Sequence, residues 1–282
     1  MVKCNYIGHD EKEFLQTVIG EKYQPGKGRL LGVYDSVAER YDTYLNDFDT
    51  IGAITNSPFS GADQRLIKEA LESCYDSETK PFAAIRGQIF TSQPEPILTL
   101  CPYCLLNWPK TLDHYIGKSA FPEFSILCKN LIPCCWDCNN EKDENWRENG
   151  QRRFIHFYND SFLDQRFLKA RLIYPPGGDV PKIEYYLEQP PAMPAAAFQI
   201  VQWHFEDLKL LSRYNQRAGP TFSAEYGAAK ELNLDHTPPE KIRHILLKRH
   251  EKHSAKVCLN YYQAIIYETL ANDLTFLASL VP

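Results

Sequence analysis

Two closely spaced pairs of cysteines are the residues whose types and spacing most clearly point to chemistry in this sequence. Cys101 and Cys104 form one C-x-x-C pair, Cys135 and Cys138 form another, and residues 105–134 separate the two pairs. Each pair can present two thiolates to one metal ion, and two pairs complete a tetrahedral zinc site. Four thiolates leave no position for water, so the spacing predicts a structural Zn²⁺ ion.

The distribution of the cysteines supports metal binding. Six of the nine lie between residues 101 and 138, whereas a secreted disulfide scaffold is shorter and spreads its cysteines more evenly. The alternative is that they are buried or redox-active thiols. Cys134 also precedes Cys138, but its spacing is one residue too long. We therefore prefer Cys135 as the ligand and expect Cys128 and Cys134 to be packed thiols.

Polar residues suited to phosphodiester hydrolysis lie between and just after these pairs. Asp113 and His114 are adjacent, Asn130 precedes the second pair and Asn139 follows it. Neighbouring residues on a strand point to opposite faces, so Asp113 can bind a metal ion while His114 accepts a proton from water. Taken singly, these signals are weak, because an Asp-His pair is often surface or core filler and Asn139-Asn140 could simply cap a helix.

Taken together, these elements resemble the zinc-containing HNH endonucleases. The pattern C-x-x-C … L-D-H … N-L-x-P-x-C-x-x-C-N-x-x-K is present in order from Cys101 to about Trp146. The resemblance implies a β-hairpin followed by a helix around one divalent cation. It also implies cleavage of nucleic acid, with DNA as the expected substrate, that leaves 5′-phosphate and 3′-hydroxyl ends.

The resemblance assigns a role to each of four residues. Asp113 matches an acidic ligand of the catalytic metal, and His114 matches the general base. Asn130 matches the residue that helps to hold the histidine loop. Asn139 matches the last position of the HNH name, where many members have histidine, and would supply a neutral oxygen ligand. Such an oxygen-rich site favours Mg²⁺ or Mn²⁺ over a transition metal.

Several cations are candidates for phosphate contact. Lys118 lies in the loop between the expected strands and could equally be a solvated lysine. Lys142 follows Asn139 by about one helical turn and could instead pair with an acid on its own helix. Residues 241–256 hold six basic residues and one acid, and could follow a phosphate backbone or form a solvated face whose apolar side packs inward. The candidates there are Lys241, Arg243, Lys248 and Arg249.

The sequence around the core also resembles a particular HNH branch. The segment TLDHYIGKSAFPEFSILCKNLIPCCWDCNNEK is similar to nucleases of bacterial anti-phage systems such as Septu and to those associated with some retrons. In that branch the nuclease acts beside an ABC-type ATPase, and this chain has no G-x-x-x-x-G-K-[ST] loop of its own. Gly117 stands where the branch is expected to have proline. The alternatives are a zinc-dependent nucleic-acid-binding module and an assembly module, neither of which cuts.

The elements around these residues predict an α+β protein that is mainly helical. We expect a helical region over 1–95, a nuclease core stapled by zinc over 96–155, and a region over 156–282 with a β-hairpin within 167–191 followed by helices. The net charge is −5, and residues 1–95 carry all of it, with 10 basic and 15 acidic residues. A basic surface elsewhere therefore remains compatible with the composition.

Composition also bears on location. The apolar content is 44%, and no stretch approaches the run of about 18 apolar residues that a membrane span needs. The first residues are polar and acidic, unlike a secretory signal. The sequence therefore predicts a cytoplasmic protein without a membrane partner.

Overall fold

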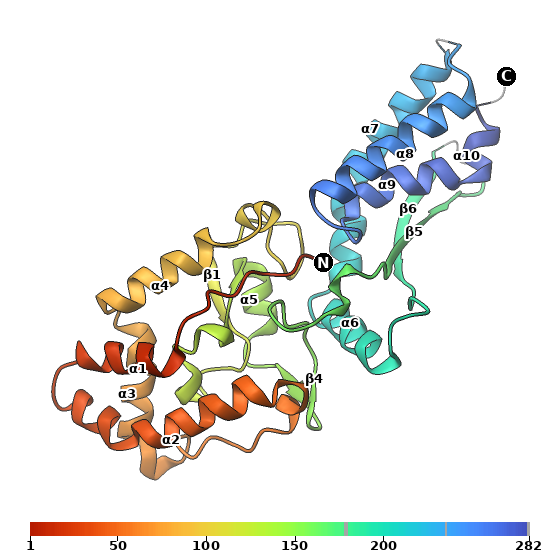
Figure 1. The fold of residues 1–282 in the computed structure, drawn as a ribbon. Coiled ribbons are helices and arrows are strands. Elements are labelled where there is room, and N and C mark those ends of the chain that lie inside the picture. The colour runs from red at the N-terminus through yellow and green to blue at the C-terminus, as the bar shows by residue number, and fades with distance from the viewer. Residues whose placement is uncertain (178–179, 235, 281–282) are drawn as a thin grey trace. The chain divides into compact units, whose positions relative to one another are not determined.

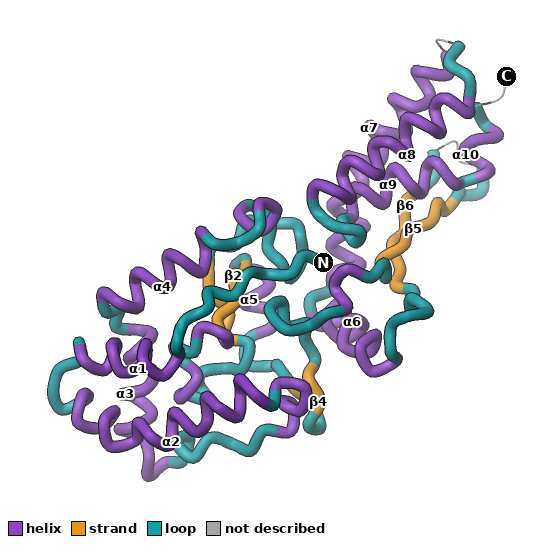
Figure 2. The backbone as a smooth tube through the Cα atoms, viewed as in Figure 1, coloured by secondary structure: helices purple, strands orange, loops and turns teal. Residues whose placement is uncertain are grey.

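The computed structural model describes residues 1–177, 180–234 and 236–280, and the chain divides into two compact units (Figure 1). One unit is Lys3–Asp160, and the other is Met1–Val2 with Ser161–Pro282. Helices combine with small two-stranded sheets in an α+β protein, as predicted (Figure 2). The expected helical region and nuclease core share one unit, which also includes residues 156–160.

Helices form the part of the first unit that precedes the cysteine pairs. Asp10 caps the first helix, because its side chain accepts hydrogen bonds from the backbone of Lys12 and Glu13. Thr79 caps the fourth helix in the same way. The elements are α1 (Glu11–Gly20), α2 (Gly26–Asn46), η1 (Phe48–Ala53), η2 (Ala62–Gln64), α3 (Arg65–Asp76), α4 (Lys80–Thr91) and η3 (Glu95–Leu98), where η denotes a 3₁₀ helix.

A β-hairpin followed by a short helix forms the centre of this unit. Strand β1 (Thr111–His114) pairs antiparallel with β2 (Leu131–Cys134), and α5 (Trp136–Lys142) follows almost at once. The register sets Thr111 opposite Cys134 and His114 opposite Leu131. The remaining elements are η4 (Pro122–Phe124), η5 (Cys128–Asn130), β3 (Arg147–Glu148) and β4 (Gln151–Arg152).

The second unit contains the expected β-hairpin and helices. Strands β5 (Leu168–Ile173) and β6 (Lys182–Leu187) pair antiparallel, and residues 178–179 of the predicted hairpin lie outside the described residues. None of the described helices has the length and apolar character that crossing a membrane requires. The other elements are η6 (Phe162–Asp164), α6 (Ala195–Asp207), α7 (Leu210–Leu234), α8 (Pro239–Lys256), α9 (Tyr262–Asn272) and α10 (Leu274–Ala278).

Candidate functional site

The two cysteine pairs meet at one point beside the hairpin. The sulfur atoms of Cys101, Cys104, Cys135 and Cys138 all lie within 4.8 Å of one another, and all four residues are buried. The Sγ atoms of Cys104 and Cys135 are 3.8 Å apart, which matches the edge of about 3.8 Å in a tetrahedron with Zn–S bonds near 2.3 Å. A disulfide would need about 2.05 Å. The group can therefore hold a metal ion such as zinc.

Local backbone turns bring the sulfurs together. In the first pair, the Cys101 carbonyl accepts hydrogen bonds from the backbone of Cys104 and Leu105, and Leu105 takes a positive φ of 52° to close the turn. In the second pair, β2 ends and α5 begins, so Cys135 stands at the start of the helix. Its backbone N–H donates to the Cys101 sulfur at 3.3 Å. Cys134 is buried outside the group of four, as is Cys128.

Asp113 lies on the face of β1 that meets α5, and both of its oxygens have partners. Tyr103 donates its hydroxyl to Oδ2 at 2.5 Å, and the Lys142 ammonium lies 3.0 Å from Oδ1. Lys142 also donates to the His114 carbonyl at 2.9 Å. The side chains of Asp113 and Lys142 are 2% and 0% exposed, so the pair fastens α5 to β1 in the interior.

This ion pair determines whether the candidate residues can bind a catalytic cation. Asn139 is on the same face as Asp113, and its Nδ2 donates to the Thr111 hydroxyl at 3.1 Å. An ammonium group already neutralises Asp113, and it would repel Mg²⁺ or Mn²⁺ at the same oxygen. In this arrangement the residues do not fit a divalent cation. Lys142 is too deeply buried for the expected contact with phosphate, and its acid is on β1 rather than on its own helix.

His114 points to the opposite face of β1 and is fixed there by a backbone carbonyl. Its Nε2 lies 2.9 Å from the Ser125 carbonyl. Because a carbonyl can only accept, Nε2 carries the proton and Nδ1 remains as the proton-accepting nitrogen. Burial lowers the pKa of His114 to about 3, so the ring is neutral at neutral pH and is a weak base in this state.

The end of α3 covers the His114 ring. The Tyr75 ring meets it edge-on, with centroids 4.4 Å apart. The Ser125 hydroxyl donates to the Leu71 carbonyl of α3 at 2.8 Å, which holds the acceptor of His114 in place. Lys118 pairs with Asp76 at the end of the same helix and lies 4.9 Å from the centre of the Tyr75 ring. Lys118 is therefore close to His114, but an acid already partners it.

Asn130 braces the loop that follows β1. Its Oδ1 accepts from the Ile116 backbone N–H at 2.7 Å, and its Nδ2 donates to the Ile116 carbonyl at 2.9 Å. The Tyr44 hydroxyl of α2 also donates to Oδ1, at 3.2 Å. Gly117 follows directly, and a Cβ there would come within 1.7 Å of a Glu144 carboxylate oxygen. Glu144 is exposed and flexible, so its carboxylate can move aside and the contact alone does not require glycine at this position.

Sequence reasoning missed two tyrosines that contact the candidate residues. Tyr103 lies inside the first C-x-x-C pair. Its position between two predicted metal ligands is the signal that could have identified it. Tyr75 lies about forty residues before His114 in the sequence, and no local pattern connects the two residues. Only the packing of α3 over the hairpin brings them together.

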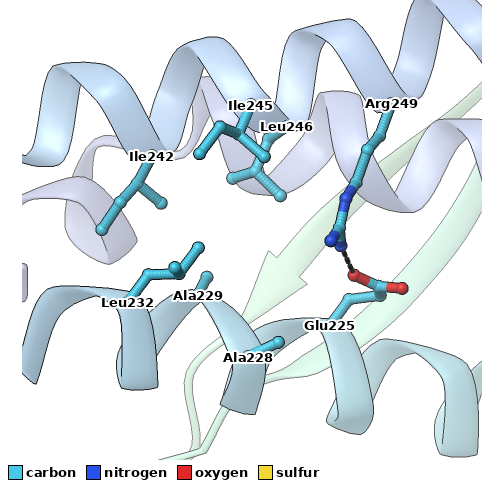
Figure 3. Close-up of a pocket in the computed structure, with 8 residues that line it drawn as sticks. All are labelled: Glu225, Ala228, Ala229, Leu232, Ile242, Ile245, Leu246 and Arg249. Atoms are coloured by element: carbon cyan, nitrogen blue, oxygen red, sulfur yellow. Dashed lines mark hydrogen bonds and ion pairs between the residues drawn. The ribbon is translucent and has the colours of Figure 1, made fainter. Parts of the chain in front are cut away.

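The basic segment of the second unit forms α8, which packs its apolar side inward (Figure 3). Ile242 and Leu246 are buried against α7, and Arg249 pairs with Glu225 of that helix. Lys248 pairs with Glu251 at 2.9 Å. The remaining two candidates differ: Arg243 donates to the Ala271 carbonyl at 3.1 Å, and Lys241 is exposed. A phosphate contact by this face stays a prediction.

Comparison with known proteins gives one partial similarity. No protein-family profile matches the chain, and no solved structure matches it significantly. Protein Ea31 of Escherichia phage lambda is 28% identical over 166 residues, which are 56% of this chain and 54% of that protein. The chain thus spans about half the length of this curated relative, whose name states no activity.

Proposed function

We propose that the chain is a metal-dependent endonuclease of the HNH type that hydrolyses phosphodiester bonds, with DNA as the expected substrate. The orientation of His114 carries the proposal, because the Ser125 carbonyl holds the Nε2 proton and leaves Nδ1 to accept another. The order β1, β2, α5 and the brace by Asn130 are the arrangement that the resemblance implies. The four cysteines would hold a structural Zn²⁺ ion beneath it.

In this proposal the side chains share the work of hydrolysis. His114 removes a proton from the attacking water at its unprotonated Nδ1. Because burial makes the ring a weak base, this step requires the ring to be opened to water. Lys118, four residues after His114 in the chain, is the nearest candidate to contact phosphate once it separates from Asp76. Activity with Mg²⁺ or Mn²⁺ requires Lys142 to leave Asp113, because the two cations compete for one carboxylate.

A plasmid-nicking assay with Mg²⁺ or Mn²⁺ tests the proposal. His114→Ala is expected to reduce cleavage by roughly 10²- to 10⁴-fold, the usual contribution of a general base. His236→Asn is a matched control, because His236 is exposed in the other unit and asparagine tolerates its positive φ of 62°. Cleavage at the wild-type rate by the His114 variant would remove His114 from the mechanism.

The resemblance to anti-phage nucleases extends the proposal to a biological role. The chain would be the effector of a bacterial defence system and would act with an ABC-type ATPase, since its sequence lacks a nucleotide-binding loop. Such a partner would be the source of the signal that releases Asp113 from Lys142. A cytoplasmic location follows from the same proposal.

One observation favours a second candidate function. The buried pair of Asp113 and Lys142 closes the place where a catalytic cation would bind. A zinc-dependent module that binds nucleic acid or assembles with a partner, without cleavage, needs no such opening. The same assay separates the two candidates, because such a module retards DNA in a gel but does not nick it with either cation.

A further inference from the structure

A second group of metal-ligating side chains lies in the first unit, apart from the four cysteines. His9 and Glu11 belong to the segment that enters α1, and Cys128 is the first residue of η5. Their ligand atoms all lie within 4.8 Å of one another. Glu11 is 3% exposed and Cys128 is 1% exposed. Burial of a carboxylate beside a thiol and an imidazole requires a compensating partner.

The hydrogen bond of His9 shows which of its nitrogens faces the group. Nδ1 lies 3.0 Å from the Ile7 carbonyl, so Nδ1 carries a proton and a neutral ring has its lone pair on Nε2. Nε2 lies 3.3 Å from Glu11 Oε2, yet it is buried without a well-formed hydrogen bond among the described residues. A lone pair facing a carboxylate oxygen is repulsive, so a positive charge belongs between them.

The separation of these two atoms distinguishes a metal ion from a proton. Zinc bonds of about 2.0–2.2 Å to nitrogen and oxygen give a tetrahedral edge of about 3.4 Å, close to the observed 3.3 Å. A protonated ring would instead direct its N–H along a straight hydrogen bond of about 2.8 Å. The distance and the poor hydrogen-bond geometry fit a metal ion between Nε2 and Oε2. The alternative is a protonated ring, because the contact with Glu11 raises the pKa of His9.

The surroundings hold the ligand atoms of Glu11 and His9 in position. Tyr6 donates to Glu11 Oε1 at 2.7 Å, and the Cys128 backbone N–H donates to Oε2 at 3.0 Å. The Ile7 carbonyl fixes the ring of His9 through its other nitrogen. Metal-binding histidines and carboxylates usually have such outer partners, which set the orientation of the ligand atoms.

We infer that His9, Glu11 and Cys128 form a second transition-metal site, and that its mixed nitrogen, oxygen and sulfur ligands take Zn²⁺. Three protein ligands leave the fourth position of a tetrahedral site for a water molecule. The site joins the N-terminal segment to η5, two residues from Asn130. It would therefore connect α1 to the loop between β1 and β2. This inference does not depend on nuclease activity.

Metal analysis of the purified full-length protein tests the site, after stripping with a chelator and titration with Zn²⁺ alone. The wild type is expected to bind about two zinc ions per chain, and Cys128→Ser and His9→Asn about one. His9→Asn is chosen because its amide can still donate to the Ile7 carbonyl while Nε2 is removed. Cys258→Ser, in the other unit, is the control and is expected to keep both ions.

Two outcomes would overturn the inference. One is a wild-type protein that takes up a single zinc ion which both Cys128→Ser and His9→Asn retain; a protonated His9 paired with Glu11 then fills the site. The other is that Co²⁺ loading gives wild type and His9→Asn the same absorption spectrum, because a mixed-ligand site would add bands beside those of the four-thiolate site. Circular dichroism of each variant verifies that it has folded.

Discussion

At the scale of single residues, Asp113 is subject to two opposing demands. The fold uses it as the partner of a buried ammonium, and a catalytic role needs it as a ligand for a divalent cation. Its carboxylate has the Tyr103 hydroxyl on one oxygen and Lys142 on the other. A buried pair adds little net stability, but removing one partner leaves an uncompensated charge in the interior. The two roles can therefore be separated by substitution.

Replacement of Lys142 tests this buried pair. Lys142→Met is expected to lower the free energy of unfolding by about 3–5 kcal/mol, because Asp113 would remain charged and buried without its partner. Urea unfolding of zinc-saturated protein measures the change. Asp113→Asn combined with Lys142→Met is expected to recover much of the loss, since asparagine still accepts from Tyr103. A loss below about 1 kcal/mol in the single variant would mean that the pair is solvated.

The pH dependence of stability reflects a second buried residue, His156. Its Nε2 contacts the Tyr44 hydroxyl and the Lys129 carbonyl, both at 3.2 Å. Burial lowers the pKa of His156 well below its usual range, with the charges of Arg152 and Lys129 acting in the same direction. The unfolded chain therefore binds the additional proton below about pH 6.5, and stability falls as the pH decreases from there.

Comparison with His156→Phe isolates this effect. Between pH 6.5 and 5, the free energy of unfolding of the wild type is expected to fall more steeply than that of the variant, by up to about 1.4 kcal/mol per pH unit. Phenylalanine keeps the ring contacts with Phe48 and Tyr115. Parallel pH profiles for the two proteins would show that His156 does not titrate differently in the folded state.

At the scale of elements, the two pairs of cysteines flank the hairpin of β1 and β2. Cys135 lies between β2 and α5, and the first pair lies at the entry to the hairpin. A hairpin of two four-residue strands is too short to be stable alone in water. The metal ion is therefore expected to supply much of the free energy that keeps these elements together.

Removal of zinc tests this dependence. A strong chelator, or Cys101→Ser with Cys138→Ser, is expected to abolish the thermal transition of the first unit while that of the second unit persists. Scanning calorimetry separates the two transitions, because the units are compact on their own contacts. Cys258→Ser is the matched control. An unchanged first transition after complete zinc removal would show that packing alone stabilises the hairpin.

The sequence patterns predicted the helices and strands better than the contacts between them. The group of four cysteines follows from spacing alone, because C-x-x-C turns are local. Helix ends are less predictable: Thr237 is a residue type that commonly caps helices, but Pro238 is the N-cap of α8 and makes no side-chain hydrogen bond. Lys142 was placed wrongly, because its partner Asp113 lies on another element and no periodicity connects them.

At the scale of the whole molecule, the division into units also depends on distant contacts. The helical region before the cysteines does not form a separate domain, because its residues reach into the hairpin loop. Tyr44 of α2 contacts Asn130, and Tyr75 of α3 covers His114. A local stretch of sequence cannot show that these helices pack against the core. The composition does show that the net charges of the two segments differ.

The uneven charge leads to a final prediction about nucleic acid. Residues 1–95 carry the net charge of −5, and α8 exposes Lys241 and Lys248 on one face of the second unit. If this face follows a phosphate backbone, Lys241→Glu with Lys248→Glu should weaken DNA binding for every sequence. It should also reduce the slope of log affinity against log salt by about 2, one for each lost phosphate contact.

The control must change the total charge equally, because a more acidic protein binds DNA less well wherever the charge lies. Lys80→Glu with Lys182→Glu meets this condition, since both lysines are exposed and neither belongs to α8. Fluorescence anisotropy with a labelled duplex at several salt concentrations measures both slopes. Equal slopes for the two double variants would show that α8 is a solvated face, and that nucleic acid is held by other residues.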